Sequence, residues 1–137
     1  MKTTKIIYWA TTALIFLFEG VLVALTWNTE LAIEGIRHLG YPAYFGPLLA
    51  LFKVIGALVL IIPAFKRRYK EWAYAGFGIV FISAAVSHTA VDGFGGQSIF
   101  PIVFFGILVA SYVTYHKKLS GVRSETTPEG LQPKLAV

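Results

Sequence analysis

Two charged residues lie inside segments that are otherwise apolar and long enough to cross a bilayer. Glu19 is within residues 6–27, and Lys53 is within residues 45–65. A charge at the centre of a membrane helix costs about 2.5–3.5 kcal/mol on insertion scales, so such residues are rare and usually have a partner. Each lies eight residues from the span end that faces the other segment. In two antiparallel helices both therefore lie about 12 Å from the same membrane face. We predict that they form an ion pair.

An ionisable residue inside the membrane also marks a candidate functional site. In one interpretation Lys53 holds an anionic or carbonyl-bearing ligand, and Glu19 neutralises it when no ligand is bound. In the other, the pair only fixes the order and register of the helices, because buried ion pairs are not stabilising by default yet can add specificity. Thr12 and Thr26 recur with Glu19 at seven-residue spacing, so these three residues share a helix face that should point into the bundle. The sequence leaves both roles open.

His88 and Asp92 form a second candidate group near the outer end of the third apolar segment. They are four residues apart and share a face if the helix continues that far. A carboxylate can orient an imidazole and raise its basicity, which suits a proton relay. We expect both to line a polar cavity near the outer face together with Glu19 and Lys53. The alternative is an interfacial histidine beside a helix-end carboxylate. One histidine and two separated carboxylates predict no metal site.

The elements that must position these residues are membrane helices. The chain has 137 residues, of which 56% are hydrophobic and 14% are charged, whereas a soluble domain has roughly a quarter charged residues. Four segments reach spanning length, at residues 6–27, 45–65, 72–91 and 99–115. The predicted fold is all-α, a polytopic four-helix transmembrane bundle over residues 1–118. Residues 119–137 are polar and are expected to form a disordered tail.

Lysine and arginine residues predict the orientation of the bundle. Ten of the eleven positive charges outside the spans lie in the N-terminal segment, the loop between spans two and three, or the tail. The positive-inside rule then puts both termini in the cytoplasm. The run Lys66-Arg67-Arg68 is expected to contact lipid head groups and not nucleic acid.

The outer connections and the helix faces carry further signals. Asn28 or Thr29 is expected to cap a short helix that ends near Gly40. Residues 89–98 contain three glycines and are expected to form a flexible turn. Small residues at four-residue spacing on the third and fourth spans predict helix packing, within the chain or in a homo-oligomer. The chain has no cysteine, which excludes disulfides, thiolate nucleophiles and cysteine-ligated iron–sulfur clusters.

Several strings together resemble the DoxX-like family of small four-helix bacterial membrane proteins. They are Leu39-Gly40-Tyr41-Pro42, Lys53 with Gly56, Ala57, Leu60 and Pro63, residues 70–77, Ser87-His88 with Asp92, and Pro101. The resemblance implies an integral protein of the inner membrane that is related to DoxX and DoxD. Those proteins are associated, as membrane subunits, with quinone-linked oxidoreductase systems that include thiosulfate oxidation. Members that rely on cysteine chemistry are no guide to this chain.

The resemblance and the polar residues together favour a membrane subunit or a quinone-interacting partner of an oxidoreductase, more than a free-standing enzyme. Its expected partners are the lipid bilayer and a redox protein. One alternative is a small proton-coupled exporter, against which Lys53 argues because a paired Glu19 would stay ionised. Another is a structural or assembly protein that has no ligand of its own.

Overall fold

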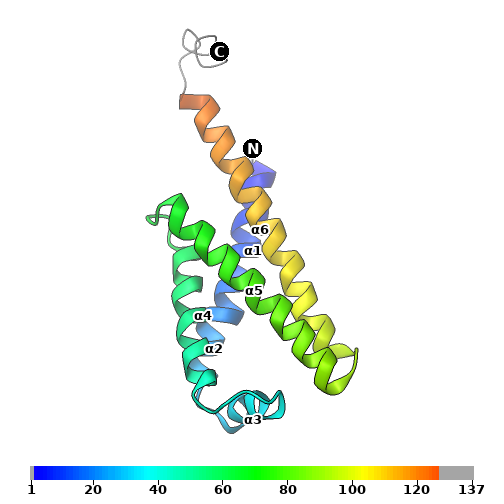
Figure 1. The fold of residues 1–137 in the computed structure, drawn as a ribbon. Helices are drawn as coiled ribbons and strands as arrows, with labels where there is room; N and C mark the ends of the chain where they lie inside the picture. Colours follow the sequence, from blue (N-terminus) through cyan, green and yellow to red (C-terminus); the bar gives the residue numbers. More distant parts are fainter. Residues whose placement is uncertain (1, 127–137) are drawn as a thin grey trace.

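The computed structural model describes residues 2–126, which are helical and contain no strand. The first span is one continuous helix made of α1 (Lys2–Ile15), a π-helical segment η1 (Phe16–Val21) and α2 (Leu22–Thr26). It is followed by α3 (Glu30–His38), α4 (Phe45–Ile61), α5 (Arg67–Asp92) and α6 (Gly96–Thr126) (Figure 1). The first helix, α5 and α6 are each long and apolar enough to cross a membrane, and α4 is a shorter apolar helix. The prediction of an all-helical membrane bundle is confirmed.

The helix ends differ from the predicted spans for local reasons. Helix α4 ends at Ile61, before the predicted end at residue 65, since Ile62 is extended ahead of Pro63 and proline disfavours a helical preceding residue. Helix α5 begins earlier than predicted and continues to Asp92, and the turn that follows it is short, with Gly93 at φ 77°. Helix α6 continues to Thr126, so residues 119–126 are helical where a disordered tail was predicted. The rest of the predicted tail, 127–137, lies outside the described residues.

The short connection between the first helix and α4 forms the predicted helix α3. Thr29 is the N-cap, and its side chain accepts a hydrogen bond from the backbone N–H of Ala32 at 3.3 Å. Gly40 follows the helix with φ +87°, a conformation that glycine adopts without steric cost. Figure 1 shows α3 lying across the end of the bundle opposite to the two termini.

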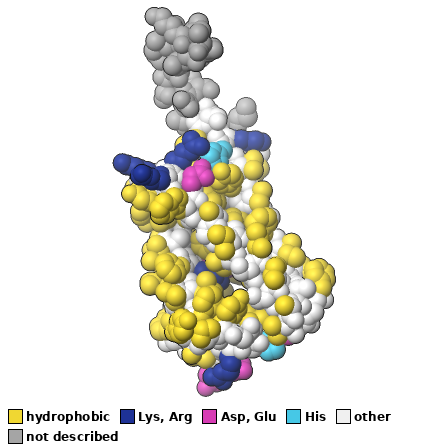
Figure 2. Space-filling model, viewed as in Figure 1, with side chains coloured by type: hydrophobic (Ala, Val, Ile, Leu, Met, Phe, Trp, Pro, Cys, Tyr) yellow, Lys and Arg dark blue, Asp and Glu magenta, His cyan; other side chains and the backbone are white. Residues whose placement is uncertain are grey.

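The helices pack so that the first helix contacts α6 along α1 and α4 along η1 and α2. Helix α5 contacts both α4 and α6 and crosses the bundle obliquely (Figure 1). Figure 2 shows hydrophobic side chains along both flanks of the molecule, with Lys and Arg side chains gathered near the end that carries the termini. This distribution suits a bundle with apolar flanks in lipid and charged ends in the interfaces.

A buried network of hydroxyl groups joins three helices in the half of the bundle nearest the termini. The Ser111 hydroxyl of α6 is 2.7 Å from the Thr12 hydroxyl of α1 and 2.7 Å from the Tyr74 hydroxyl of α5. All three residues are buried. Because lipid offers no water to a polar group, these hydroxyls must be satisfied inside the protein. The network therefore fixes the rotation of α1, α5 and α6 relative to one another.

Lys70 is not the surface charge that its position in the sequence predicts. By its position in the sequence it belongs to the flanking charges of the loop between spans two and three, but its side chain is buried, with 3% of the residue exposed. Its ammonium donates to the carbonyls of Val59 at 3.0 Å and Leu60 at 2.8 Å. These carbonyls lie in the last turn of α4, where carbonyls lack intrahelical partners and the helix dipole favours a cation. Lys70 thus caps α4 from α5.

Candidate functional site

The first helix widens into a π-helical turn at Glu19. Such turns are rare and frequently occur at functional sites. Next to Glu19, Gly20 allows the backbones of η1 and α4 to come close, because a Cβ atom at Gly20 would lie only 2.9 Å from the Cβ of Ala57. Ala57 is one turn from Lys53 and is fully buried. Gly56 does not serve this approach, since it lies against Phe77 of α5 instead.

Glu19 and Lys53 form the ion pair predicted from their depths. The Lys53 Nζ atom is 2.8 Å from the Glu19 Oε2 atom, and the two side chains are 20% and 10% exposed. An ammonium carries three N–H donors. Within residues 2–126 the Glu19 Oε2 atom has no hydrogen-bond partner, so the pair is an ionic contact and the ammonium donors remain for another acceptor.

Lys53 also lines two hollows. We call the end of the bundle that carries α3 its outer end and the end that carries the termini its inner end (Figure 1). The first hollow, which we name the outer pocket, lies among α2, α3 and the start of α4 and has a volume of about 210 Å³. Its lining includes Thr26, Ile33, Ile36, Tyr41, Ala50 and Lys53. The second, which we name the membrane groove, lies between α4 and α5 and has a volume of about 370 Å³. Its lining includes Lys53, Gly56, Val59, Tyr69, Gly76 and Phe77. Lys53 thus lies where a pocket near the outer end meets an almost wholly apolar groove.

His88 and Asp92 belong to a different cluster from the ion pair. The Asp92 Oδ1 atom is 2.6 Å from the Nε2 atom of His38, which comes from α3. The His88 Nδ1 atom is 3.9 Å from the Asp92 Oδ2 atom, too far for a hydrogen bond, and this nitrogen is buried without a hydrogen-bond partner. Neither His88 nor Asp92 lines the outer pocket or the membrane groove. Neither hollow brings all four side chains together, so a single cavity that they share stays a prediction.

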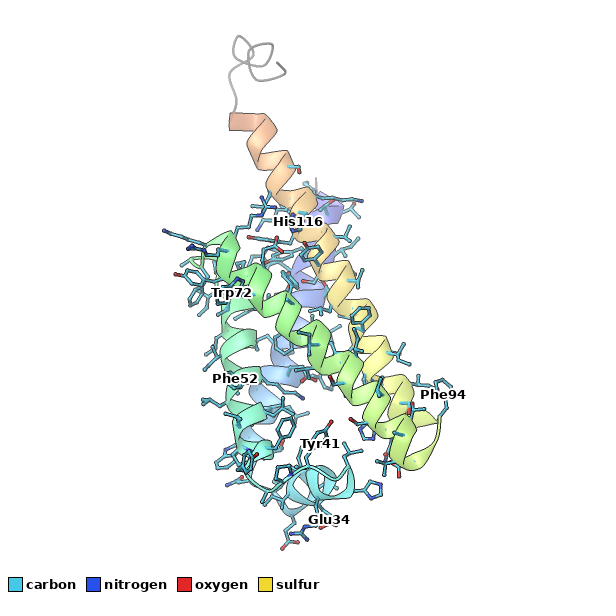
Figure 3. The ribbon with its side chains drawn as sticks, in the orientation of Figure 1. Glu34, Tyr41, Phe52, Trp72, Phe94 and His116 are labelled. Carbon is cyan, nitrogen blue, oxygen red and sulfur yellow. The ribbon has the colours of Figure 1, made fainter. Side chains whose placement is uncertain are left out.

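The reason is the lateral position of α5, which depth along the membrane does not determine. At its outer end α5 is joined to the α3 region by the His38–Asp92 contact and by a 2.6 Å hydrogen bond between the hydroxyls of Tyr41 and Ser87. Tyr41 lies between α3 and α5 in Figure 3 and also lines the outer pocket. Tyr41 consequently links the outer pocket to Ser87, the residue that precedes His88.

Sequence reasoning missed His38 and the roles of Tyr41 and Ser87. It also missed a pair at the inner end, where the His116 Nε2 atom of α6 is 2.8 Å from the Glu71 Oε1 atom of α5. All of these partners are distant in sequence, and no local pattern indicates them. Glu71 and His116 take no part in the outer pocket or the membrane groove.

We expect Tyr41→Phe to loosen α3 at the outer end of the bundle. The change removes the hydroxyl that bonds Ser87, and a typical intramolecular hydrogen bond contributes about 1 kcal/mol. Hydrogen exchange of the backbone amides in residues 30–41 should then be about fivefold faster in the variant, as measured by mass spectrometry in detergent. Tyr44→Phe is the control, because Tyr44 is an exposed residue of the same loop. Equal exchange in both variants would show that the Tyr41–Ser87 bond does not hold α3.

The site can offer hydrogen-bond donors and acceptors within an apolar surrounding. In residues 2–126 no three His, Asp or Glu side chains are arranged to hold a metal ion. The Lys53 ammonium suits a carbonyl or anionic oxygen, and the adjoining apolar groove suits a hydrocarbon group. A quinone, which combines both, fits this set of residues.

Comparison with known proteins identifies the family. Neither the curated proteins nor the solved structures gave a match to this chain. The model of the DoxX-like family matches residues 7–111, a segment that includes Glu19, Lys53, His88 and Asp92. Given this match and its long apolar helices, the chain is a multi-pass membrane protein that belongs to the DoxX-like family.

Proposed function

We propose that this protein binds the head group of a membrane-soluble quinone at Lys53 and serves as a membrane subunit of an oxidoreductase system. One observation carries the proposal. Lys53, whose ammonium is 2.8 Å from Glu19, is a lining residue of both the outer pocket and the membrane groove. A charged donor inside a membrane bundle is generally functional, and here it adjoins space that can hold an apolar molecule.

Each member of the pair has a distinct part in this proposal. Lys53 donates a hydrogen bond to a carbonyl oxygen of the head group. Glu19 balances the charge of the ammonium, which would otherwise be costly to keep among apolar side chains. The close contact of Gly20 with Ala57 holds the two charged residues together. The bound quinone would supply the redox chemistry of the complex.

The cluster at the outer end would exchange protons with the outer side. In this proposal His88 and Asp92 would act as a proton relay once a water or ligand bridges the 3.9 Å between them, and the His38–Asp92 contact would extend it to α3. The Ser87 and Tyr41 hydroxyls lead from this cluster to the outer pocket. Electron transfer is assigned to a redox partner, since the chain has no cysteine to ligate an iron–sulfur cluster. In this proposal the termini face the cytoplasm of a cell with an inner membrane.

We expect a benzoquinone without a side chain to bind the purified protein in nanodiscs. The Lys53→Met variant should bind it at least about tenfold more weakly, since hydrogen bonds to charged groups contribute about 1.5–3 kcal/mol. Equilibrium binding of the labelled quinone measures this. Lys66→Met is the control, because Lys66 lies outside both hollows and at the start of α5. The proposal is overturned if the wild-type protein does not bind the probe, or if Lys53→Met binds it as well as the control.

The double variant Glu19→Gln with Lys53→Met separates this proposal from a purely structural role. A binding site predicts a folded double variant that no longer binds the quinone. A pair that only orders the helices predicts loss of fold, with no bound quinone in the wild-type protein. Mass spectrometry of molecules and proteins that co-purify in mild detergent would identify the natural ligand and the redox partner.

A further inference from the structure

We propose that the membrane groove is a binding site for the long hydrocarbon tail of an amphiphile whose uncharged, oxygen-bearing head lies at Lys53. This inference rests on the proposed function and adds the class of ligand and the residues that select it. It assigns a role to Gly76 and Val59, which belong neither to the ion pair nor to the outer cluster of His38, His88 and Asp92.

The membrane groove is long enough to hold an extended alkyl chain. Its α5 wall runs from Tyr69 to Val80, which at 1.5 Å rise per residue is a length of about 16 Å. The α4 wall runs from Phe52 and Lys53 to Val59. Because α4 and α5 are consecutive antiparallel helices, Lys53 and Val80 lie at the outer end of the groove, and Val59 and Tyr69 lie at the inner end. The groove therefore has one charged end and an otherwise apolar course.

The middle of the groove is open because of one glycine. A Cβ atom at Gly76 would have no atom within 4 Å, which shows empty space over this position. Phe77 closes the groove from behind, since it is buried and lies against Gly56 at the depth of the α4 backbone. A larger side chain at Gly76 would fill the space that a tail needs.

The position of the charge selects the head group. A phospholipid that lay in the groove with its phosphate at the inner interface would bring its terminal methyl to Lys53, so the ammonium would gain no partner. In the reverse direction its charged phosphate would lie at the depth of Lys53, between the helices, where an ionic group is expensive to desolvate. An uncharged carbonyl loses far less on leaving water and still accepts a hydrogen bond from the ammonium.

The tail is recognised by fit and not by the hydrophobic effect. A tail already dissolved in lipid gains little by moving to an apolar groove, as helices gain little by associating in lipid. Affinity therefore comes mainly from the Lys53 end, and the groove admits or excludes the tail according to its shape. It follows that filling the groove should affect only ligands that have a tail.

The experiment compares two benzoquinones with the same ring, one with a ten-carbon alkyl tail and one without. Binding is measured on the full chain in nanodiscs of dimyristoyl phosphatidylcholine. Gly76→Leu should weaken the affinity for the tailed probe about tenfold, which is the effect expected when a side chain fills space that the tail would occupy. The affinity for the tailless probe should change less than about twofold. Gly106→Leu is the matched control, because Gly106 is an exposed glycine of α6 that also has open space around it.

Val59→Phe fills the same groove from the opposite helix and serves if Gly76→Leu does not fold. Lys53→Met should weaken both probes. The groove inference is overturned if Gly76→Leu and Val59→Phe bind the tailed probe as the wild type does, even though both probes still depend on Lys53. If the wild type binds neither probe, the proposed function fails. A co-purified phospholipid that Gly76→Leu releases would then assign the groove to an acyl chain and overturn the inference as well.

Discussion

Glu19→Gln is expected to lower the free energy of unfolding by about 3–5 kcal/mol, the usual effect of removing one partner from a buried ion pair. The variant leaves the Lys53 ammonium in the bundle with only one fifth of its side chain exposed and no anion at 2.8 Å. Lys53→Met should have a similar effect, since it leaves the carboxylate of Glu19 alone. Reversible unfolding in mixed detergent micelles, followed by circular dichroism, gives the free energy of each variant.

The double variant Glu19→Gln with Lys53→Met should recover most of the loss, because replacing a whole buried pair by uncharged groups is often close to neutral. The control pair is Arg37 and Glu34, which are 3.1 Å apart but 73% and 65% exposed. Removing either of these should change the stability by less than about 1 kcal/mol. If Glu19→Gln has no larger effect than Glu34→Gln, the intramembrane pair does not hold the fold together.

Gly20→Ala is expected to destabilise the protein by about 1–3 kcal/mol, the range for overpacking a close contact. The new Cβ atom would lie 2.9 Å from the Cβ of Ala57 and 3.3 Å from the ring of Phe16. Ala57 cannot move aside by changing rotamer, since its Cβ is fixed to the backbone of α4. The helices must separate, which also stretches the adjacent Glu19–Lys53 pair. Quinone affinity should therefore fall together with stability in the same unfolding and binding assays.

A second change tests this explanation. Adding Ala57→Gly to Gly20→Ala removes the opposing Cβ atom and should restore most of the stability and binding. Gly106→Ala is the control, because a Cβ atom there meets no other atom within 4 Å. This control should be neutral or slightly stabilising, since alanine has the higher helix propensity by about 1 kcal/mol. A Gly20→Ala variant as stable as the control would show that the contact is not tight.

The sequence by itself determined the features that depend on distance along one helix. Hydropathy and length predicted the four apolar helices, and equal depth paired Glu19 with Lys53, because a buried charge in an antiparallel bundle needs a partner at its own level. Short-range capping predicted α3, with Thr29 and Gly40 at its ends. These predictions rest on one helix or on one turn, where residue type and spacing are sufficient.

Only the tertiary structure decided which helix faces meet. It placed His38 beside Asp92 and put Lys53 at the junction of a pocket and a groove that His88 and Asp92 do not line. It also turned Lys70 from a predicted surface charge into a cap for α4. The physical reason is that helix rotation and crossing angle arise from packing between residues far apart in the chain. The spacing along any one helix determines the depth of a side chain, but it does not determine which residue of another helix lies beside it.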